Sequence, residues 1–369
     1  MAEWGYNRLR EKAVILIPAL NPPDTFADYI KELIQAGFQD IIVVDDGSAS
    51  SRCFEEIQNM GGTILKHKRN EGKGQALKTG FFYYKEKYLP DGYAGVITVD
   101  SDGQHLVKDV EKIAAALTDG TGKLILGSRD FSLPQVPPKS RFGNNLTVKI
   151  FKYFLRMDIR DTQTGLRGIP NCLIDECLGF PGKRFEYETE MLMAVGKKAG
   201  ICEVPVETVY LEANKETHFN PVVDSLKIYY VIFRTFFRYV FSSLSASLLD
   251  LSLFALFSKL VFGKWKYKIW IATAIARSVS ACYNFGMNRS VVFRSNRPLL
   301  LSAVGYFSLC IVQGLASAVL VSTVTERLRA DEVLVKLIVD TLLFFVSYQI
   351  QRKLIFKRGE WDRGKQEKA

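Results

Sequence analysis

Four long apolar stretches near the end of the chain constrain its fold more than any other feature. A helix needs about 20 apolar residues to cross the hydrocarbon core of a bilayer, and each stretch reaches or nearly reaches that length. They run over Tyr239–Phe262, Ile269–Met287, Leu299–Val324 and Val333–Ile350. Four such runs in succession argue against a soluble bundle of buried helices. The sequence therefore predicts an all-α transmembrane domain of four helices over residues 236–356, followed by a basic tail at 357–369.

Basic residues around these stretches predict an orientation. The tail and the connection after the second stretch carry ten Lys and Arg residues, against five on the opposite side. Because cytoplasmic loops are enriched in Lys and Arg, we expect the tail and the preceding domain to be cytoplasmic, in a plasma (inner) membrane. The polar, charged N-terminus predicts no cleavable signal peptide. Six cysteines without a CxxC pair, and only three histidines, argue against a zinc site or a disulfide framework.

Four charged residues lie inside the predicted spans. They are Asp250, Arg277, Lys336 and Asp340. Charges in a membrane are costly and usually face the interior of a helix bundle. Two interpretations stay open: a polar path or lipid-phosphate site, or charge pairing that only fixes the bundle.

The predicted membrane domain contains an internal repeat. Tyr283–Arg289 with Phe293 parallels Val346–Arg352 with Phe356, at an offset of 63 residues. Each copy ends a span with a polar residue, an arginine and an aromatic residue. The repeat indicates two helical hairpins related by duplication.

Residues 1–235 alternate apolar strand patterns with helical patterns. The predicted strands are Ala13–Ile17, Ile41–Val44, Gly62–Leu65, Tyr93–Val99 and Leu124–Leu126. The predicted helices lie between Asp24 and Gly37, at Lys73–Tyr88 and at Val107–Leu117. This order predicts an α/β fold with a mostly parallel sheet covered by helices on both faces.

Polar residues follow three of the predicted strands, where ligands of such sheets bind. They are Asn21, the run Asp45-Asp46-Gly47-Ser48 and the run Asp100-Ser101-Asp102-Gly103-Gln104. Asp100, Asp102 and Gln104 offer hard oxygen ligands for Mg²⁺ or Mn²⁺ bridging a diphosphate. For the first of these runs the alternative is an N-cap of the next helix, and for the second it is a solvated turn.

Five motifs in order resemble glycosyltransferase family 2, which has the GT-A fold. They are IPALN (17–21), VVDDGS (43–48), NEGKGQALKTG (70–80), DSDGQH (100–105) and GSR (127–129). The nearest branch is the polyprenyl-phosphate glycosyltransferases, similar to dolichol-phosphate mannose synthase. The repeat in the spans resembles GtrA-like membrane domains, which are associated with polyprenyl-phosphate-linked sugars.

The resemblance implies site residues. Residues at the nucleotide sugar would be Pro18, Leu20, Asn21, Asp45, Asp46, Lys73, Asp100, Ser101 and Asp102. Asp100, Asp102 and Gln104 would hold the metal, and Arg129, Arg141 and Asn145 the acceptor phosphate. The family often has Tyr in place of Leu20 and Glu in place of Pro22, which bears on base stacking and donor choice.

An acceptor-side motif, Asp161–Arg167, supplies a further candidate. Arg167 has the planar, permanently charged fork of a phosphate or carboxylate clamp, and the alternative is a surface arginine in a turn. In the acidic run Phe185–Glu190, Glu190 is the candidate site residue, although acids in a first helical turn are often only dipole partners. His218 is expected to be structural.

The chemistry predicted from the resemblance is a single displacement with inversion. A phosphate monoester is already largely ionised at neutral pH, with a second pKa of about 6, so it needs no general base. The donor is GDP-mannose, UDP-glucose or UDP-N-acetylglucosamine, which the sequence does not distinguish, and the acceptor is a polyprenyl phosphate. The sequence leaves open whether the protein forms a homo-oligomer, and it contains no nucleic-acid-binding motif.

Two other interpretations remain at this stage. A processive polysaccharide synthase would carry a Gln-x-x-Arg-Trp motif, which the sequence lacks. A lipid-linked sugar transporter would not need an intact Asp-Ser-Asp-Gly-Gln motif. The segment Asn144–Met157 is either an amphipathic helix at the membrane surface or a helix packed in the core.

Overall fold

The computed structural model describes residues 13–134, 136–207, 223–261 and 266–356. The chain divides into two compact units, Met1–Val231 and Ile232–Ala369, which are described separately. His218, the basic tail at 357–369 and the polar N-terminus lie outside the described residues.

The first unit is built on a seven-stranded sheet with the order β3-β2-β1-β4-β6-β5-β7. Its strands are β1 (Ala13–Ala19), β2 (Ile41–Asp45), β3 (Thr63–Lys66), β4 (Gly95–Thr98), β5 (Leu124–Arg129), β6 (Arg167–Pro170) and β7 (Ile201–Val206). Within the described residues, every strand pair is parallel except those of β6, which runs antiparallel to both β4 and β5. The predicted mostly parallel α/β sheet is therefore confirmed.

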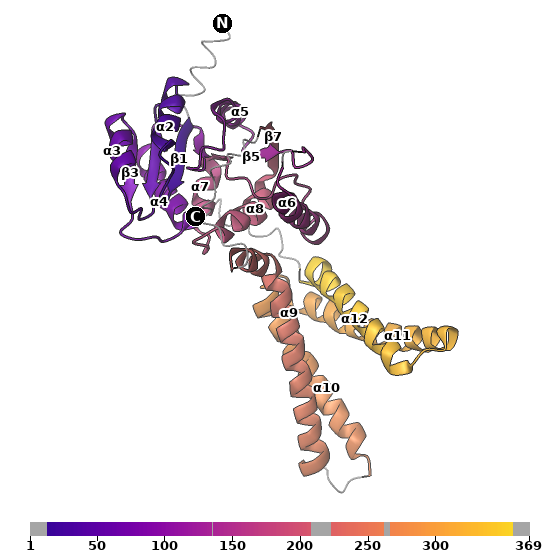
Figure 1. The fold of residues 1–369 in the computed structure, drawn as a ribbon. Helices are drawn as coiled ribbons and strands as arrows, with labels where there is room; N and C mark the ends of the chain where they lie inside the picture. Colours follow the sequence, from indigo (N-terminus) through magenta and orange to yellow (C-terminus); the bar gives the residue numbers. More distant parts are fainter. Residues whose placement is uncertain (1–12, 135, 208–222, 262–265, 357–369) are drawn as a thin grey trace. The chain divides into compact units, whose positions relative to one another are not determined.

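Helices connect these strands and cover the sheet (Figure 1). They are α2 (Phe26–Gln35), α3 (Arg52–Asn59), α4 (Lys73–Lys87), α5 (Val107–Thr118), α6 (Pro138–Ile150) with the π-helical turn η1 (Phe151–Leu155), α7 (Asn171–Leu178) and α8 (Glu186–Ala199).

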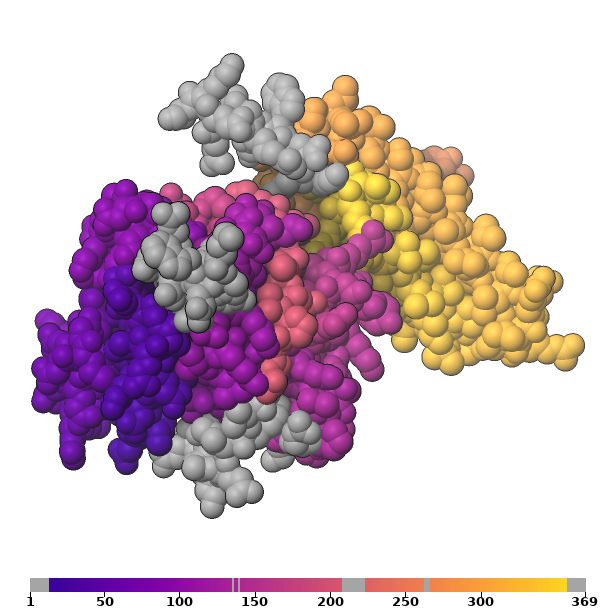
Figure 2. Space-filling model, turned by 90° about the horizontal axis from the view of Figure 1, so that it is seen from above, coloured from indigo at the N-terminus to yellow at the C-terminus, as the bar shows by residue number. Residues whose placement is uncertain are grey.

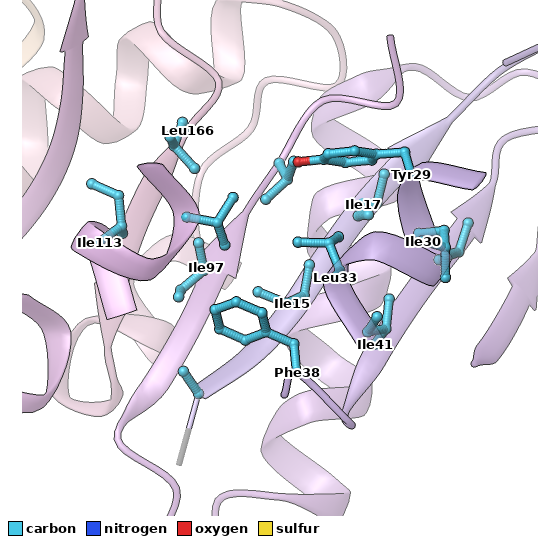
Figure 3. Close-up of a cluster of buried hydrophobic side chains, with 14 of the residues drawn as sticks. Ile15, Ile17, Tyr29, Ile30, Leu33, Phe38, Ile41, Ile97, Ile113 and Leu166 are labelled. Carbon is cyan, nitrogen blue, oxygen red and sulfur yellow. The ribbon is translucent and has the colours of Figure 1, made fainter. Parts of the chain in front are cut away.

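Alternation along β1 assigns the two faces of the sheet. Figure 3 shows Ile15 and Ile17 of β1 beside Ile30 and Leu33 of α2, and these side chains are fully buried. Leu16 points to the other face, where a Cβ on Gly80 of α4 would overlap it. Because both faces are covered, the central strands are apolar throughout rather than alternating with polar residues.

The helix expected at Asn144–Met157 begins earlier and ends earlier. Pro138, which can occupy the first turn of a helix because its missing N–H needs no partner there, starts α6, and η1 ends at Leu155. Phe151 of this segment is buried, whereas Phe142 and Tyr153 are 72% and 77% exposed. One face is thus packed in the core, and the other presents aromatic rings.

The second unit is helical. It contains most of α9 (Val223–Ala255), then η2 (Leu256–Val261), α10 (Lys268–Met287), η3 (Asn288–Val292), α11 (Leu299–Leu328), α12 (Glu332–Ile350) and η4 (Gln351–Ile355). Within the described residues, three helices are long and apolar enough to cross a membrane: Val223–Val261, Leu299–Leu328 and Glu332–Ile355.

The predicted count of four spans is therefore not confirmed. The second stretch does form a helix, α10, but polar residues such as Ser278, Ser280 and Asn284 lie along it and lower its mean hydropathy. The outward faces of the other helices are apolar: Leu300 and Val333 are each 77% exposed. Figure 2 shows the side chains of α11 and α12, in orange and yellow, packed side by side.

The charged residues in these helices have partners within their own helical pairs. Arg277 lies 3.7 Å from Asp250, to which Ser280 also donates. Lys336 lies 3.0 Å from Asp340, one turn along α12. Of the two interpretations left open by the sequence, these contacts favour charge pairing within the bundle.

Candidate active site

Three neighbouring strands bring the predicted polar loops to one edge of the sheet. β2, β1 and β4 are adjacent, and their parallel direction places the loops after Asp45, Ala19 and Val99 together. Asn21 links the first two loops: its N–H donates to Ser48 Oγ, and its Oδ1 accepts from Ala49 N, both over 2.9 Å. Its φ of 46° is a conformation that Asn tolerates better than most residues. Pro18 is buried in β1 and Leu20 is half-buried.

The side chains of Asp45 and Asp46 are both buried. Oδ1 of Asp45 accepts from Ser48 N over 2.7 Å, and its Oδ2 lies 3.6 Å from Lys66 Nζ. The carboxylate of Asp46 accepts from Glu71 N, Gly72 N and the Nδ1 of His67, at 2.7–2.9 Å. Neither caps the next helix, whose N-cap is Ser51. Asp46 fixes the loop that leads into α4, and therefore the position of Lys73.

Lys73 connects two carboxylates at this edge. Its Nζ lies 2.7 Å from Asp100 Oδ1 and 3.0 Å from Glu188 Oε2. Burial alone would lower the pKa of Lys73, but the two carboxylates outweigh it and raise that pKa above its ordinary value. The ammonium is therefore charged at physiological pH.

Asp100 and Asp102 differ in their surroundings. Burial alone would raise the pKa of Asp100, but the Lys73 ammonium and then His105 hold it well below its usual range. His105 Nε2 lies 3.4 Å from Asp100 Oδ2. Burial and the nearby Asp100 charge raise the pKa of Asp102, whose Oδ1 accepts from Gln104 N over 3.0 Å. Ser101 and Gln104 are half-buried in the same turn.

Asp100 and Asp102 supply part of a binding site for a divalent cation. The donors are hard carboxylate oxygens, and burial together with the Asp100 charge raises the pKa of Asp102, so a cation near both carboxylates would offset their repulsion. Within the described residues, no group of three or more His, Cys, Asp or Glu could hold a metal ion. A cation here would have to complete its shell with oxygens from a ligand, such as a diphosphate.

The predicted acceptor-side residues lie around β5 and α6. Arg129 makes a bidentate contact with Asp161, through Nε at 2.6 Å and a terminal nitrogen at 3.1 Å. Arg141 donates to Leu133 O over 2.7 Å, and its Nε is buried with no hydrogen-bond partner among the described residues. Asn145 is exposed, whereas its neighbour Asn144 is buried and hydrogen-bonds to the 160–162 loop.

Arg167 and Glu190 are both buried and bonded within the protein. Arg167 is only 1% exposed; it donates to Thr164 O and Glu188 O, and it lies 4.0 Å from the Glu188 carboxylate. Its hydrogen bonds go to main-chain oxygens, and because the side chain is buried the alternative of a surface arginine in a turn is wrong. Glu190 Oε2 accepts from Gly182 N over 2.8 Å.

Sequence reasoning missed three residues of this site. The sequence indicates Glu190, but it is Glu188 of the same helix that forms an ion pair with Lys73. His67 holds Asp46 and also contacts Thr79 Oγ1 at 2.9 Å. Gly165 lies so close to Asp100 that a Cβ would overlap its carboxylate. Only Glu188 had a signal in the sequence, its place in the acidic first turn of a helix.

Comparisons with known proteins match both parts of the chain to known families. Residues 14–176 match the family described as Glycosyl transferase family 2, and residues 238–356 match the GtrA/DPMS transmembrane domain. An uncharacterized protein of Methanocaldococcus jannaschii is 31% identical over 232 residues, covering 59% of this chain and 90% of the relative.

Several relatives have named activities. A UDP-N-acetylglucosamine–dolichyl-phosphate N-acetylglucosaminyltransferase of Methanococcus voltae is 27% identical, covering 58% of this chain and 92% of the relative. A dolichyl-phosphate beta-glucosyltransferase of Dictyostelium discoideum is 27% identical, covering 61% and 74%.

Solved structures are more distant. A mannosyl-3-phosphoglycerate synthase from Rubrobacter xylanophilus is 14% identical with a TM-score of 0.47, covering 62% of this chain and 75% of that one. From the sequence matches together with the fold, the chain is a glycosyltransferase of family 2 that carries a GtrA/DPMS transmembrane domain.

Proposed function

We propose that the protein transfers one sugar from a nucleotide diphosphate sugar to a polyprenyl phosphate, undecaprenyl or dolichyl, at the cytoplasmic face of the membrane. The observation that carries this proposal is the Asp100–Asp102 pair at the sheet edge, where Lys73 forms an ion pair with Asp100. The named relatives act on dolichyl phosphate, and the GtrA/DPMS match supports a membrane acceptor.

The donor side follows from the charges at this edge. Lys73 contributes a fixed positive charge beside the predicted diphosphate position, and the loops held by Asn21 and Asp45 form the nucleoside side. A Mg²⁺ or Mn²⁺ ion on Asp100, Asp102 and Gln104 would supply charge neutralisation for the departing diphosphate. Pro18, Leu20, Asp46 and Ser101 complete the predicted donor site.

The acceptor side relies on arginines. An ionised phosphate needs no base, so the task of the protein is to bring this anion into line with the anomeric carbon and to exclude water. Arg141 has an unused buried Nε, and Arg129 presents a guanidinium oriented by Asp161. Attack from the side opposite the leaving diphosphate inverts the anomeric carbon.

The exposed face of α6 and η1 supports a membrane-facing acceptor site. Phe142 and Tyr153 are exposed, with Lys149 and Lys152 exposed between them. Aromatic rings beside lysines are typical of segments that lie in the interface of an anionic bilayer. We place both residues 1–235 and the tail at 357–369 on the cytoplasmic side of the membrane.

A donor panel tests the proposal. Purified full-length protein is mixed with polyprenyl phosphate, Mg²⁺ or Mn²⁺, and GDP-mannose, UDP-glucose or UDP-N-acetylglucosamine, and the lipids are analysed by mass spectrometry. A lipid carrying a single sugar is the expected product. A polymer would instead identify a processive synthase, and no turnover with any donor would favour a lipid-linked sugar transporter.

A further inference from the structure

Lys73 is shared between two carboxylates that come from distant parts of the chain. Asp100 follows β4, and Glu188 lies in the first turn of α8. The side chains of Lys73, Asp100 and Glu188 are 18%, 28% and 12% exposed, so water screens these contacts only in part. The ammonium lies 2.7 Å from one carboxylate and 3.0 Å from the other, and it therefore has an anchor that is independent of Asp100.

Arg167 holds Glu188, the second carboxylate partner of Lys73, in place. Its guanidinium donates to the main-chain oxygen of Glu188 over 2.8 Å and lies 4.0 Å from the Glu188 carboxylate. The same guanidinium donates to Thr164 O, next to Gly165, whose bare Cα makes room for the Asp100 carboxylate. Glu188 is thus held by a buried charge that belongs to the strand beside Asp100, rather than by a flexible surface contact.

A cation bound to Asp100 and the ammonium of Lys73 repel each other. Two unit charges 4 Å apart interact with about 4 kcal/mol at the effective dielectric of a protein surface. Removing the Lys73 charge would therefore strengthen cation binding. Removing Glu188 would leave the ammonium with Asp100 as its one remaining carboxylate partner among the described residues.

We propose that Glu188 is a positioning residue: it competes with Asp100 for the Lys73 ammonium and so sets the affinity of the Asp100–Asp102 pair for a divalent cation. Lys73 remains at the site when a cation is bound, because Glu188 retains it. This inference rests on the proposed metal-dependent function and concerns only the residues that tune it.

A double-mutant cycle on Mn²⁺ affinity tests it. Wild type, Lys73→Met, Glu188→Gln and the double variant are purified as full-length chains in detergent. Free Mn²⁺ is measured by electron paramagnetic resonance, with no nucleotide and no turnover. Thermal unfolding without Mn²⁺ checks that each variant is folded.

The expected Mn²⁺ affinities follow from competition between the cation and the Lys73 ammonium for Asp100. Lys73→Met tightens Mn²⁺ binding about tenfold, and Glu188→Gln weakens it about tenfold, each a modest part of the Coulomb interaction. In the Lys73→Met background, Glu188→Gln weakens binding less than about threefold, because residues that act through one another are non-additive. Equal effects of Glu188→Gln in both backgrounds would overturn the proposal, since Glu188 would then act only as a negative charge near the metal.

Two controls separate this inference from the proposed function. Glu186→Gln removes the same charge from the same helix turn, but the Glu186 carboxylate accepts from Lys183 N and Arg184 N instead; it is expected to leave Mn²⁺ affinity within about twofold of wild type. Asp102→Asn is expected to abolish Mn²⁺ binding. If wild type bound no Mn²⁺, the metal site of the proposed function would fail; if it bound Mn²⁺ and the cycle were additive, this inference alone would fail.

Discussion

Asn288 donates a hydrogen bond from Nδ2 to Oε1 of Gln351 over 3.0 Å, and these two residues occupy equivalent positions of the internal repeat, 63 residues apart. Phe293 and Phe356, the aromatic residues of the same repeat, stack with ring centroids 5.4 Å apart. Both polar residues begin π-helical turns, η3 and η4. The repeat thus pairs with itself, which gives the duplication seen in the sequence a structural role.

Leucine substitutions at Asn288 and Gln351, singly and together, test that role. Gln351→Leu leaves the buried Asn288 amide without its partner and is expected to cost about 1–2 kcal/mol of stability. The double variant Asn288→Leu/Gln351→Leu removes both polar groups and is expected to cost less than the single one. Reversible unfolding in mixed micelles measures the difference; a double variant that was less stable than Gln351→Leu would contradict a simple amide pair.

Gly165→Ala is expected to damage the metal site without unfolding the sheet. A Cβ at this position overlaps the Asp100 carboxylate, which must then move. A displacement of about 1 Å can cost about 100-fold in rate, so we expect a loss of that order in transfer. Gly143→Ala is the matched control, because a Cβ there meets only Gln163 Nε2, at 3.6 Å. Equal activity of the two variants would show that Asp100 need not be held at its place.

Arg141→Gln is expected to affect the acceptor and not the donor. The unpartnered buried Nε of Arg141 is available to an anion, and a hydrogen bond to a charged group contributes about 1.5 kcal/mol or more. The KM for polyprenyl phosphate should rise about tenfold, while the KM for the nucleotide sugar stays the same. Steady-state kinetics with each substrate varied in turn decides this; a change confined to the donor KM would place Arg141 on the nucleotide side.

Arg167→Met is expected to destabilise the first unit. Breaking a buried charge pair by removing one partner typically costs about 3–5 kcal/mol, because the other charge stays buried. Arg160→Met serves as the control, since Arg160 is exposed and its hydrogen bonds within the described residues use only its main-chain atoms. Denaturant unfolding followed by circular dichroism compares the two; similar free energies of unfolding would mean that Arg167 contributes no buried ion pair.

Much of the sheet could be predicted because its strands are buried on both faces. Ala13–Ile17 and Ile41–Val44 are uninterrupted apolar runs, and the structure extends them only to Ala19 and Asp45. β6 escaped prediction because Arg-Gly-Ile-Pro has no apolar periodicity and forms a strand only by pairing with β4 and β5. Local sequence does not encode such a pairing.

Partners within the site were harder to predict than its location. Strand ends identified the edge where Asp45, Asp100 and Asp102 would lie, because parallel strands end together. Nothing local shows that Lys73 meets Glu188, which is more than a hundred residues away. On a helix, residues two apart point to nearly opposite sides, so choosing Glu190 over Glu188 required the orientation of α8, which tertiary packing sets.

The nucleotide released during transfer tests the central claim most directly. Wild type is incubated with polyprenyl phosphate and its preferred donor, and phosphorus NMR follows the products. Release of a nucleoside diphosphate together with a lipid-linked sugar of the opposite anomeric configuration is predicted, and Asp102→Asn should release neither. A nucleoside monophosphate, a retained configuration or an active Asp102→Asn variant would contradict displacement of a metal-bound diphosphate by the lipid phosphate.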